Sequence, residues 1–415
     1  MKLLVLTAGL ESSTLDPAAG WMHELTTRLA ARGHRVTVMC TRSPESPATQ
    51  EEPDGVTVWQ PAERDRASVL AALLELEPDV VHVAATGPLS SEVTAALAKA
   101  PVLIDVVDWS PLCPAGDLLA RPQGLPCTLH YPHAPCGDCV GHSHVREMEP
   151  YLAMTRAGHR VVAHTGNVRD RATTALGRGV SLVPVGVDAI HFQPEPEAPL
   201  SPDVAALASD RSHPRVVVLG PPTPARGGEG LLDLLVAIHA RAPGAELVVP
   251  GVDPGNPDHL HVLLAEAKEL GISTQLTALP HVSRADLPAL LVACDVGVAP
   301  GLAPEPLGLS LVQALAVGLA VVAHPSETTR ELLLDGSAGV LANAPPTGRF
   351  ADAVVKLLRD RAARMALGER ARLAALEHHD LDRALFDMET LYERVRVAHA
   401  LRPEPARSGR RRAAA

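Results

Sequence analysis

Apolar and polar positions follow two alternating periods along most of this chain. Short runs rich in Val, Leu and Ala, typical of buried strands, are separated by stretches in which apolar residues recur every three or four positions, as in helices. The first such pair is a strand over Lys2–Thr7 and an amphipathic helix from Gly20 to about Arg32. Because strands that alternate with helices usually pair in parallel, the pattern predicts a doubly wound α/β fold.

The same pattern occurs twice, on either side of a segment rich in Pro, Ala, Ser and Asp. We therefore predict an N-terminal domain over residues 1–192, a linker over 193–214 and a C-terminal domain over 215–378. A helix over 379–400 is expected to pack back on the N-terminal domain, and residues 401–415 are expected to form a disordered tail. Two open sheets of this kind leave a ligand cleft between the carboxyl ends of their strands.

The remaining predicted strands form one group in each domain. They are Arg35–Cys40, Val56–Gln60, Val80–Ala84, Val102–Val107, Val161–His164 and Ser181–Pro184 in the N-terminal domain, and Arg215–Leu219, Glu246–Val249, Gln275–Ala278, Val296–Ala299, Ala320–Ala323 and Ala338–Leu341 in the C-terminal domain.

Composition narrows the classes of protein. A hydrophobic fraction of 46% and a charged fraction of 20% suit a soluble globular protein, and a net charge of −11 argues against a nucleic-acid binder, which needs a basic face. No apolar run reaches the ~18 residues of a membrane helix, so we expect at most peripheral membrane association. The short apolar N-terminus lacks a cleavage pattern, so a cytoplasmic protein with reduced cysteines is expected.

The stretch Glu305–Ala323 contains a carboxylate in a loop, a short apolar helix, a glycine and a buried strand. The first free amides of that helix, near Leu309 and Ser310, form an anion site suited to a diphosphate. Glu305 just before them can accept hydrogen bonds from sugar hydroxyls, which indicates a nucleotide-sugar site. The loop after the first strand lacks Gly-x-Gly-x-x-Gly, so NAD chemistry is disfavoured.

Four segments, in this order, carry a family resemblance. They are Gly20 to Val36, with its Arg-Gly-His-Arg-Val ending; Val183-Pro-Val-Gly-Val-Asp188, followed by Phe192; Leu219-Gly, followed by Arg226-Gly-Gly-Glu-Gly-Leu-Leu; and Glu305 to Ala323. Together they resemble the retaining glycosyltransferases of family 4. The resemblance implies a GT-B fold, in which two Rossmann-like domains face each other across a cleft. It also implies metal-independent transfer of a sugar from a UDP- or GDP-sugar to a hydroxyl acceptor.

The resemblance implies a set of donor-binding residues in the C-terminal domain. Glu305 would contact the donor sugar, and Gln313 stands where the family has a glutamate for the ribose hydroxyls. Pro221 stands at the family's Arg position and Arg226 at its Lys position, which leaves one cation for the diphosphate. The full set is Gly220, Arg226, Gly227, Glu305, Gly308, Leu309, Ser310 and Gln313.

On the acceptor side the resemblance implies Asp108 and the loop glycines Gly9 and Gly20. The family's His-Asp pair is Val107-Asp108 in this chain, so the histidine is missing, and Glu305 and Asp108 are the candidate catalytic residues. Structural roles compete with these roles. Asp108 can cap a turn, and Glu305 can cap the following helix. Arg226 can be a surface charge, and Gln313 can make a structural hydrogen bond.

These departures keep a second function open, a degenerate GT-B protein that binds a nucleotide sugar or a partner without turnover. A GT-B epimerase acting on the donor sugar would need acid and base side chains in the cleft, for which the sequence offers no matching set.

A Cys-rich insertion over about residues 109–146 interrupts the N-terminal domain. Cys113, Cys127, Cys136 and Cys139 lie within it, together with several histidines and many Pro and Gly residues. A Cys-x-x-Cys pair with two more thiolates is typical of a structural zinc site, so zinc is the expected metal. The alternative is four unligated thiols. No cofactor is expected for catalysis.

Overall fold

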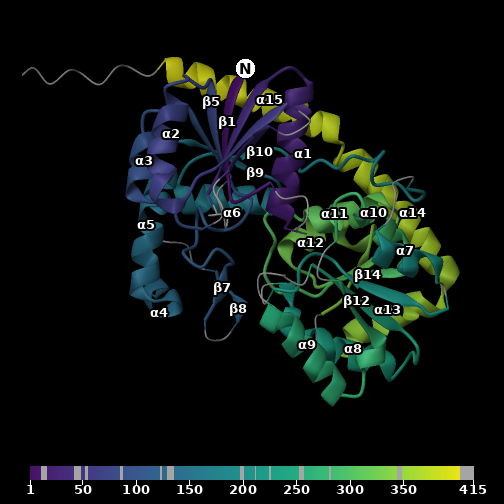
Figure 1. Cartoon of the computed structure of the whole chain (residues 1–415). Helices are drawn as coiled ribbons and strands as arrows, with labels where there is room; N and C mark the ends of the chain where they lie inside the picture. The colour runs from purple at the N-terminus through teal and green to yellow at the C-terminus, as the bar shows by residue number, and fades with distance from the viewer. Residues whose placement is uncertain are drawn as a thin grey trace, which may run out of the picture.

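Two α/β domains, each with a central sheet between helices, make up the computed structural model of this chain (Figure 1). The predicted GT-B architecture is therefore confirmed. The structure describes residues 1–10, 16–41, 48–51, 55–84, 87–121, 124–128, 135–196, 201–210, 212–223, 226–251, 257–279, 282–343 and 348–401.

The N-terminal domain holds an eight-stranded sheet in the order β10-β9-β6-β5-β1-β2-β4-β3 within the described residues. All neighbours pair in parallel except β3 and β4, whose antiparallel pairing was not predicted. The strands are β1 (Lys2–Thr7), β2 (Arg35–Cys40), β3 (Ala48–Glu51), β4 (Val56–Gln60), β5 (Val80–Ala84), β6 (Val102–Asp105), β9 (Arg160–Ala163) and β10 (Ser181–Leu182).

Helices cover both faces of this sheet, and the Cys-rich insertion adds a small hairpin. The helices are α1 (Pro17–Ala31), α2 (Arg66–Leu74), α3 (Ser91–Leu97), α4 (Cys136–Val140), α5 (His142–Arg156) and α6 (Gly166–Leu176), and the hairpin pairs β7 (Leu119–Ala120) with β8 (Leu125–Pro126).

The C-terminal domain holds a six-stranded parallel sheet in the order β13-β12-β11-β14-β15-β16, again within the described residues. Its strands are β11 (Arg215–Val218), β12 (Glu246–Pro250), β13 (Leu276–Leu279), β14 (Val296–Ala299), β15 (Ala320–Ala323) and β16 (Val340–Leu341). Its helices are α7 (Pro202–Ser209), α8 (Leu231–His239), α9 (Pro257–Glu269), α10 (Leu287–Val292), α11 (Leu309–Ala316), α12 (Glu327–Leu332), α13 (Gly348–Arg359) and α14 (Arg361–His378).

Helix α7 lies inside the segment expected to be a linker, which is a difference from the prediction. Pro202 stands at the first helical position, where its missing N–H costs no hydrogen bond. Val204 and Leu207 are buried, and α7 packs against α10, so this part of the segment belongs to the C-terminal domain.

The chain crosses between the domains twice, and the two crossings lie side by side. The backbone N–H of Val187 donates to the carbonyl of His379 over 2.9 Å, and Val187 also pairs with Asp380. A Cβ at Gly186 would lie 2.6 Å from the Cα of Leu381, so the close crossing requires glycine. After it, α15 (Leu381–Ala400) runs from α14 along the N-terminal domain (Figure 1).

Buried polar groups fasten α15 to the first sheet. The Tyr392 hydroxyl lies 2.7 Å from His82 Nδ1, and Asp105 lies 3.0 Å from His82 Nε2 and 2.7 Å from His164 Nε2. His164 Nδ1 lies 2.7 Å from the carbonyl of Val183. Both partners of His164 are hydrogen-bond acceptors, so its ring is held on both sides.

Burial of Asp105 would by itself raise the pKa of its carboxyl. The charge and hydrogen bond of His164, together with those of His82, outweigh burial and hold the pKa of Asp105 well below its usual range.

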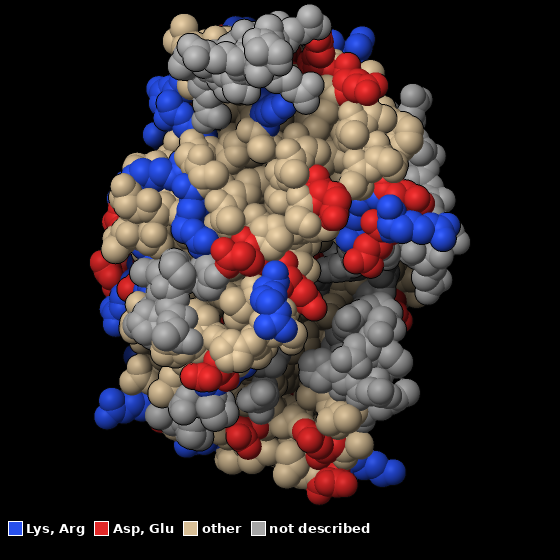
Figure 2. Space-filling model, turned by 90° about the vertical axis from the view of Figure 1, so that its left-hand side faces the viewer, with Lys and Arg blue, Asp and Glu red and all other residues tan. Residues whose placement is uncertain are grey.

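On the face in Figure 2, acidic and basic side chains are interspersed, and neither sign gathers into a broad patch. None of the helices in the described ranges is long and apolar enough to cross a membrane.

Candidate functional site

Two adjoining hollows lie at the carboxyl ends of the C-terminal strands, facing the N-terminal domain. The first hollow lies between the start of α1, at Asp16 and Gly20, and the C-terminal residues Gly220 and Gln313. The second hollow lies between the loop before α11 and the start of α12. Leu219 and Ser310 line both. With their open mouths included, the hollows measure about 660 and 460 Å³.

The position of the hollows follows from the sheet order. β11 pairs with β12 on one side and with β14 on the other, so the winding direction reverses between β11 and β14. Ligands of open α/β sheets bind in the crevice at such a switch point. Leu219 and Gly220 extend β11 into this crevice, and Ala299 ends β14 there.

Gly220 lies close to two residues that were predicted to bind the diphosphate, Arg226 and Ser310. Its φ of +83° favours glycine, and a Cβ there would lie 3.2 Å from Ser310 Oγ and 3.4 Å from Arg226 Nη1. Gly227 also has a positive φ, +80°, and its Cβ would lie 3.1 Å from the Pro300 carbonyl carbon. Both predicted turn glycines are thus required by backbone geometry close to Arg226.

The start of α11 faces both hollows without a side-chain cap. Gly308 is the N-cap, with a φ of +65°, and a Cβ there would lie 2.2 Å from Leu332 Cδ1. Leu309 lines the first hollow, and Ser310 lines both. Since no side chain hydrogen-bonds the start of this helix among the described residues, the alternative role of Glu305 as its cap is wrong.

Glu305 forms an ion pair with Arg226 through its side chain and is fixed through its backbone. Arg226 Nε donates to Glu305 Oε1, and the two side chains are 21% and 28% exposed. Thr328 Oγ1 donates to the Glu305 carbonyl over 2.8 Å. Arg226 is therefore paired within the second hollow and is not an isolated surface charge.

Gln313 lies on α11 and lines the first hollow. Its side chain is half-buried, and within the described part of the chain neither a hydrogen-bond partner nor the alternative structural hydrogen bond is present. A half-buried amide with open donors and acceptors is suited to a ligand diol.

Asp108 caps the turn that follows β6. The backbone N–H of Ser110 donates to Asp108 Oδ1 over 2.9 Å, and the Ser110 hydroxyl donates to Oδ2 over 2.8 Å. Burial, and next the charge of Asp16, raise the pKa of Asp108 to about 7 against the lowering effect of these two bonds. The turn-capping role is thus present, and the group titrates near neutral pH.

The two predicted acceptor-side glycines differ in their surroundings. A Cβ at Gly20 would lie 3.4 Å from Leu309 Cδ2, so Gly20 marks a close approach between α1 and α11 across the domains. Gly9 follows β1, and nothing lies within 4 Å of the position of its Cβ. The next loop residues, 11–15, lie outside the described residues.

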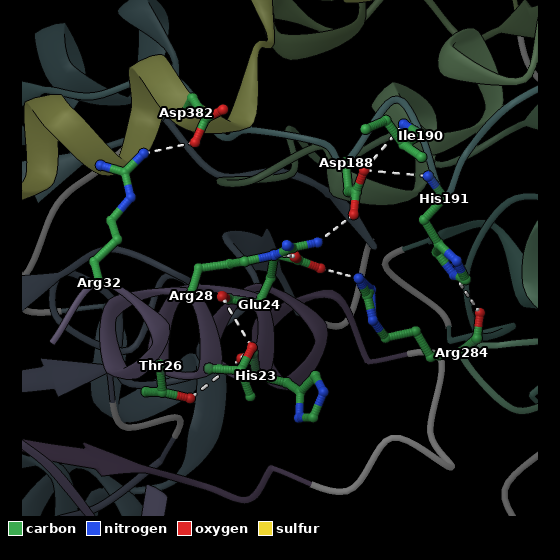
Figure 3. Close-up of polar contacts among 11 residues, drawn as sticks. His23, Glu24, Thr26, Arg28, Arg32, Asp188, Ile190, His191, Arg284 and Asp382 are labelled. Carbon is green, nitrogen blue, oxygen red and sulfur yellow. Dashed lines mark hydrogen bonds and ion pairs between the residues drawn. The ribbon is translucent and has the colours of Figure 1, made fainter. Parts of the chain in front are cut away.

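A ring of polar contacts joins the domains beside the first hollow (Figure 3). Arg284, in the loop before α10, pairs with Glu24 on α1, and Glu24 accepts from Arg28 Nε over 2.9 Å. Arg28 also pairs with Asp188 in the first crossing segment. Asp188 accepts from the backbone N–H of His191 over 3.1 Å, and His191 Nε2 donates to the Arg284 carbonyl over 3.1 Å, which closes the ring.

A second group of contacts joins the domains beside the second hollow. Glu331 on α12 accepts from the backbone N–H groups of Gly166 and Asn167, over 2.6 and 3.1 Å, at the start of α6. Arg171 pairs with Glu327 over 2.7 Å. The Trp109 indole N–H donates to the carbonyl of Pro304 over 2.8 Å.

Several residues of these hollows were not predicted. Arg284, His23 and Pro250 line the first hollow, and Ser326 and Thr328 line the second. Pro250 ends β12 and Ser326 follows β15, so the rule that ligands bind at the carboxyl ends of strands was the available signal. His23 and Arg284 carry no such signal.

The four insertion cysteines are all described and are all free of disulfides. Among the described residues, no three or more His, Cys, Asp or Glu side chains are placed to hold one metal ion. His130 and His133, which the sequence interleaves with these cysteines, lie outside those residues. The structural zinc therefore stays a prediction.

Both halves of the chain match known families. Residues 19–190 match Glycosyltransferase Family 4, and residues 203–374 match Glycosyl transferases group 1. The GDP-mannose-dependent alpha-(1-6)-phosphatidylinositol monomannoside mannosyltransferase of Mycobacterium tuberculosis is 32% identical over 57% of this chain and 62% of its own length. The D-inositol 3-phosphate glycosyltransferase of Mycobacterium bovis is 36% identical over 35% of this chain and 30% of its own length. The chain thus matches less than two thirds of the length of these curated relatives.

Solved structures share the fold at low identity. Sucrose-phosphate synthase of Thermosynechococcus elongatus superposes with a TM-score of 0.70 at 16% identity, over 96% of this chain and 100% of that one. Anabaena Alr3699/HepE in complex with UDP-glucose superposes with a TM-score of 0.70 at 18% identity, over 95% and 100%.

Proposed function

Because this chain consists of a glycosyltransferase family 4 domain and a glycosyl transferases group 1 domain in the GT-B fold, we propose that it transfers a sugar from a nucleotide diphosphate donor to a hydroxyl acceptor, with retention at the anomeric carbon. One observation carries the proposal. Two hollows meet at Ser310, beside an uncapped helix start, with Gln313 in one and with Arg226 and Glu305 in the other.

Each part of the donor has a complementary place in this arrangement. The nucleoside occupies the first hollow, where Gln313 binds the ribose hydroxyls. The diphosphate lies at the amides of Leu309 and Ser310, and Arg226 neutralises part of its charge. The sugar occupies the second hollow, where Glu305 accepts from its hydroxyls. Catalysis then consists of positioning and stabilisation of the leaving diphosphate.

UDP- and GDP-sugars are the proposed donors. One relative is named as GDP-mannose-dependent, and one structural neighbour is described in complex with UDP-glucose. We propose that the acceptor hydroxyl lies on the N-terminal side, near Asp108. Ser110 donates one hydrogen bond to each carboxylate oxygen of Asp108. Each oxygen keeps a further lone pair that can accept from a hydroxyl and orient it.

A second candidate function is donor binding without turnover. Arg226 and Glu305, the two charged residues that would bind the donor in the second hollow, pair with each other. Val107, Pro221 and Gln313 stand where the family resemblance leads one to expect a His, an Arg and a Glu.

A nucleotide screen followed by a turnover assay tests both candidates. A ligand at 100 times its Kd stabilises the folded state by about 2.7 kcal/mol, so UDP or GDP should raise the Tm of the wild-type chain. Gln313→Ala should abolish most of this shift. If no nucleoside diphosphate raises the Tm, both candidates are wrong. Donor hydrolysis or transfer by the purified chain would exclude the second.

A structural zinc in the insertion is also proposed. Cys136 and Cys139 lie one turn apart on α4. Cys139 Sγ lies 3.4 Å from the Arg121 amide, and the Cys127 amide donates to the carbonyl of Leu118 over 2.6 Å, so both cysteines lie beside the β7–β8 hairpin. Metal analysis should find about one zinc per chain, and its loss in a Cys136→Ser, Cys139→Ser variant. A metal-free, fully folded wild-type chain would contradict this proposal.

A further inference from the structure

We propose that Trp109 is a positioning residue that holds the Glu305 loop of the C-terminal domain against the Asp108 turn of the N-terminal domain. The roles of Asp108 and Glu305 in this statement rest on the proposed function. The contact itself does not. The indole N–H of Trp109 donates to the Pro304 carbonyl over 2.8 Å, between residues 195 positions apart in the sequence.

Burial makes the loss of this hydrogen bond costly. Trp109 is only 1% exposed, and its indole N–H can only donate a hydrogen bond. A buried N–H without a partner would lose its hydration without replacement. The partner is a loop carbonyl of the opposite domain, so the indole packs in the N-terminal core while its N–H contacts the C-terminal domain directly.

The loop that receives the bond carries Glu305. The Pro304 carbonyl is held by Trp109, and the next carbonyl, that of Glu305, accepts from Thr328 Oγ1 over 2.8 Å. Two consecutive carbonyls are therefore fixed from opposite domains. The Glu305 backbone stays in place while its side chain exchanges Arg226 for a ligand.

Trp109 is itself rigidly placed beside Asp108. Its carbonyl accepts from the amides of Leu112 and Cys113, over 2.9 and 2.7 Å, and its own amide donates to Gly116. The Arg171 guanidinium lies 6.0 Å from the centre of the indole ring and pairs with Glu327 on α12. The turn of Asp108 and the loop of Glu305 are thus set relative to each other through one side chain.

Trp109→Phe tests the proposal, since phenylalanine keeps an aromatic ring and removes the donor. Trp59→Phe is the matched control, because Trp59 lies on β4, at the far side of the N-terminal sheet from β6. The first readout is hydrogen exchange of peptides spanning residues 303–316, which include the Val312 amide bonded to Gly308. Exchange should be about five to ten times faster in Trp109→Phe and unchanged in Trp59→Phe. Equal exchange in wild type and Trp109→Phe would overturn the proposal.

The second readout separates positioning from nucleotide binding. In Trp109→Phe, kcat for sugar transfer should fall about tenfold, while the Kd for UDP or GDP alone changes less than twofold. An equal loss in both would indicate general damage and overturn the positioning role. If the wild-type chain turns over no donor, the proposed function fails, whereas the exchange experiment still decides the role of Trp109.

A wild-type measurement covers the case in which Trp109→Phe does not fold. The chain has three tryptophans, and Trp21→Phe and Trp59→Phe assign two of the three indole N–H signals in ¹⁵N-tryptophan-labelled protein. The remaining signal, from Trp109, should exchange with solvent at least tenfold more slowly than that of half-buried Trp59. Exchange as fast as that of Trp59 would contradict the buried bond to Pro304.

Discussion

The ring of contacts beside the first hollow gives a sharp prediction about stability. Glu24 is the centre of this ring, with a side chain that is 8% exposed and pairs with Arg28 and Arg284 (Figure 3). Glu24→Gln keeps the shape and one acceptor oxygen but removes the negative charge. Arg284 then stays at the domain interface without its counter-charge.

The expected loss lies between two known limits. Removing one partner of a fully buried ion pair costs about 3–5 kcal/mol, and an exposed pair contributes about 0–1 kcal/mol. The carboxylate of Glu24 is buried, but Arg28 and Arg284 are 46% and 22% exposed, so water solvates part of the freed charge. We expect a loss of about 2 kcal/mol, which corresponds to a fall of about 4–8 °C in Tm.

Asp382→Asn, on α15, is the matched control. Asp382 pairs over 2.6 Å with Arg32, the residue that directly follows α1, but is 85% exposed, so the same change of carboxylate to amide should lower the Tm by less than about 2 °C. Scanning calorimetry at low and high salt measures both variants. The Glu24 effect should persist at high salt, because buried pairs are screened little. Equal shifts for the two variants would refute the argument from burial.

Three further predictions concern substitutions that change charge. Asp105→Asn removes a buried carboxylate that faces both His82 and His164 and should cost about 3–5 kcal/mol at pH 7. Because the native pKa of Asp105 is lowered, its stabilisation is present above pH ~4 and should fade as the pH drops further, which closes the gap in Tm between wild type and variant. Asp108→Asn should act in the opposite sense, because the native pKa of Asp108 is raised to about 7. The ionised carboxylate destabilises the wild-type fold as the pH rises from ~4 through 7. The variant should therefore be more stable than wild type at pH 8 and equally stable below pH 4. Gln313→Glu and Pro221→Arg should show a favourable coupling of about 1 kcal/mol in a calorimetric double-mutant cycle of UDP or GDP binding, and strict additivity would contradict it.

The local structure of the proposed donor side, α11 and β15, could be predicted because it depends on neighbouring residues. The glycine at position 308 and the apolar period after it specify α11, and the Val-rich run after Gly318 specifies β15. The same kind of signal existed for α7, where Ser201 and Pro202 open a helix with buried Val204, but the overall Pro and Ala content favoured a linker.

The contacts between the domains could not be predicted in this way. Glu24 and Arg284 are 260 positions apart, and Trp109 and Pro304 are 195 apart. Neither periodicity nor motif spacing encodes which exposed charge of one domain meets which charge of the other. The pairing depends on the angle between the domains, which only the complete fold determines.

The unusual residues of the proposed donor site are easier to understand as a set than one by one. In the pattern that the chain resembles, two cations and two carboxylates surround the donor, so their charges cancel. In this chain the position of one cation is occupied by Pro221 and the position of one carboxylate by Gln313. The charges of the remaining pair, Arg226 and Glu305, still cancel. A carboxylate at position 313 beside a single cation would give these side chains a net negative charge with Glu305 and would repel the diphosphate. The pair that remains is partly exposed and worth at most about 1 kcal/mol, so a diphosphate can recruit Arg226 from Glu305 at little cost. The two substitutions therefore compensate each other electrostatically, which favours a site that still binds its donor over one that has decayed.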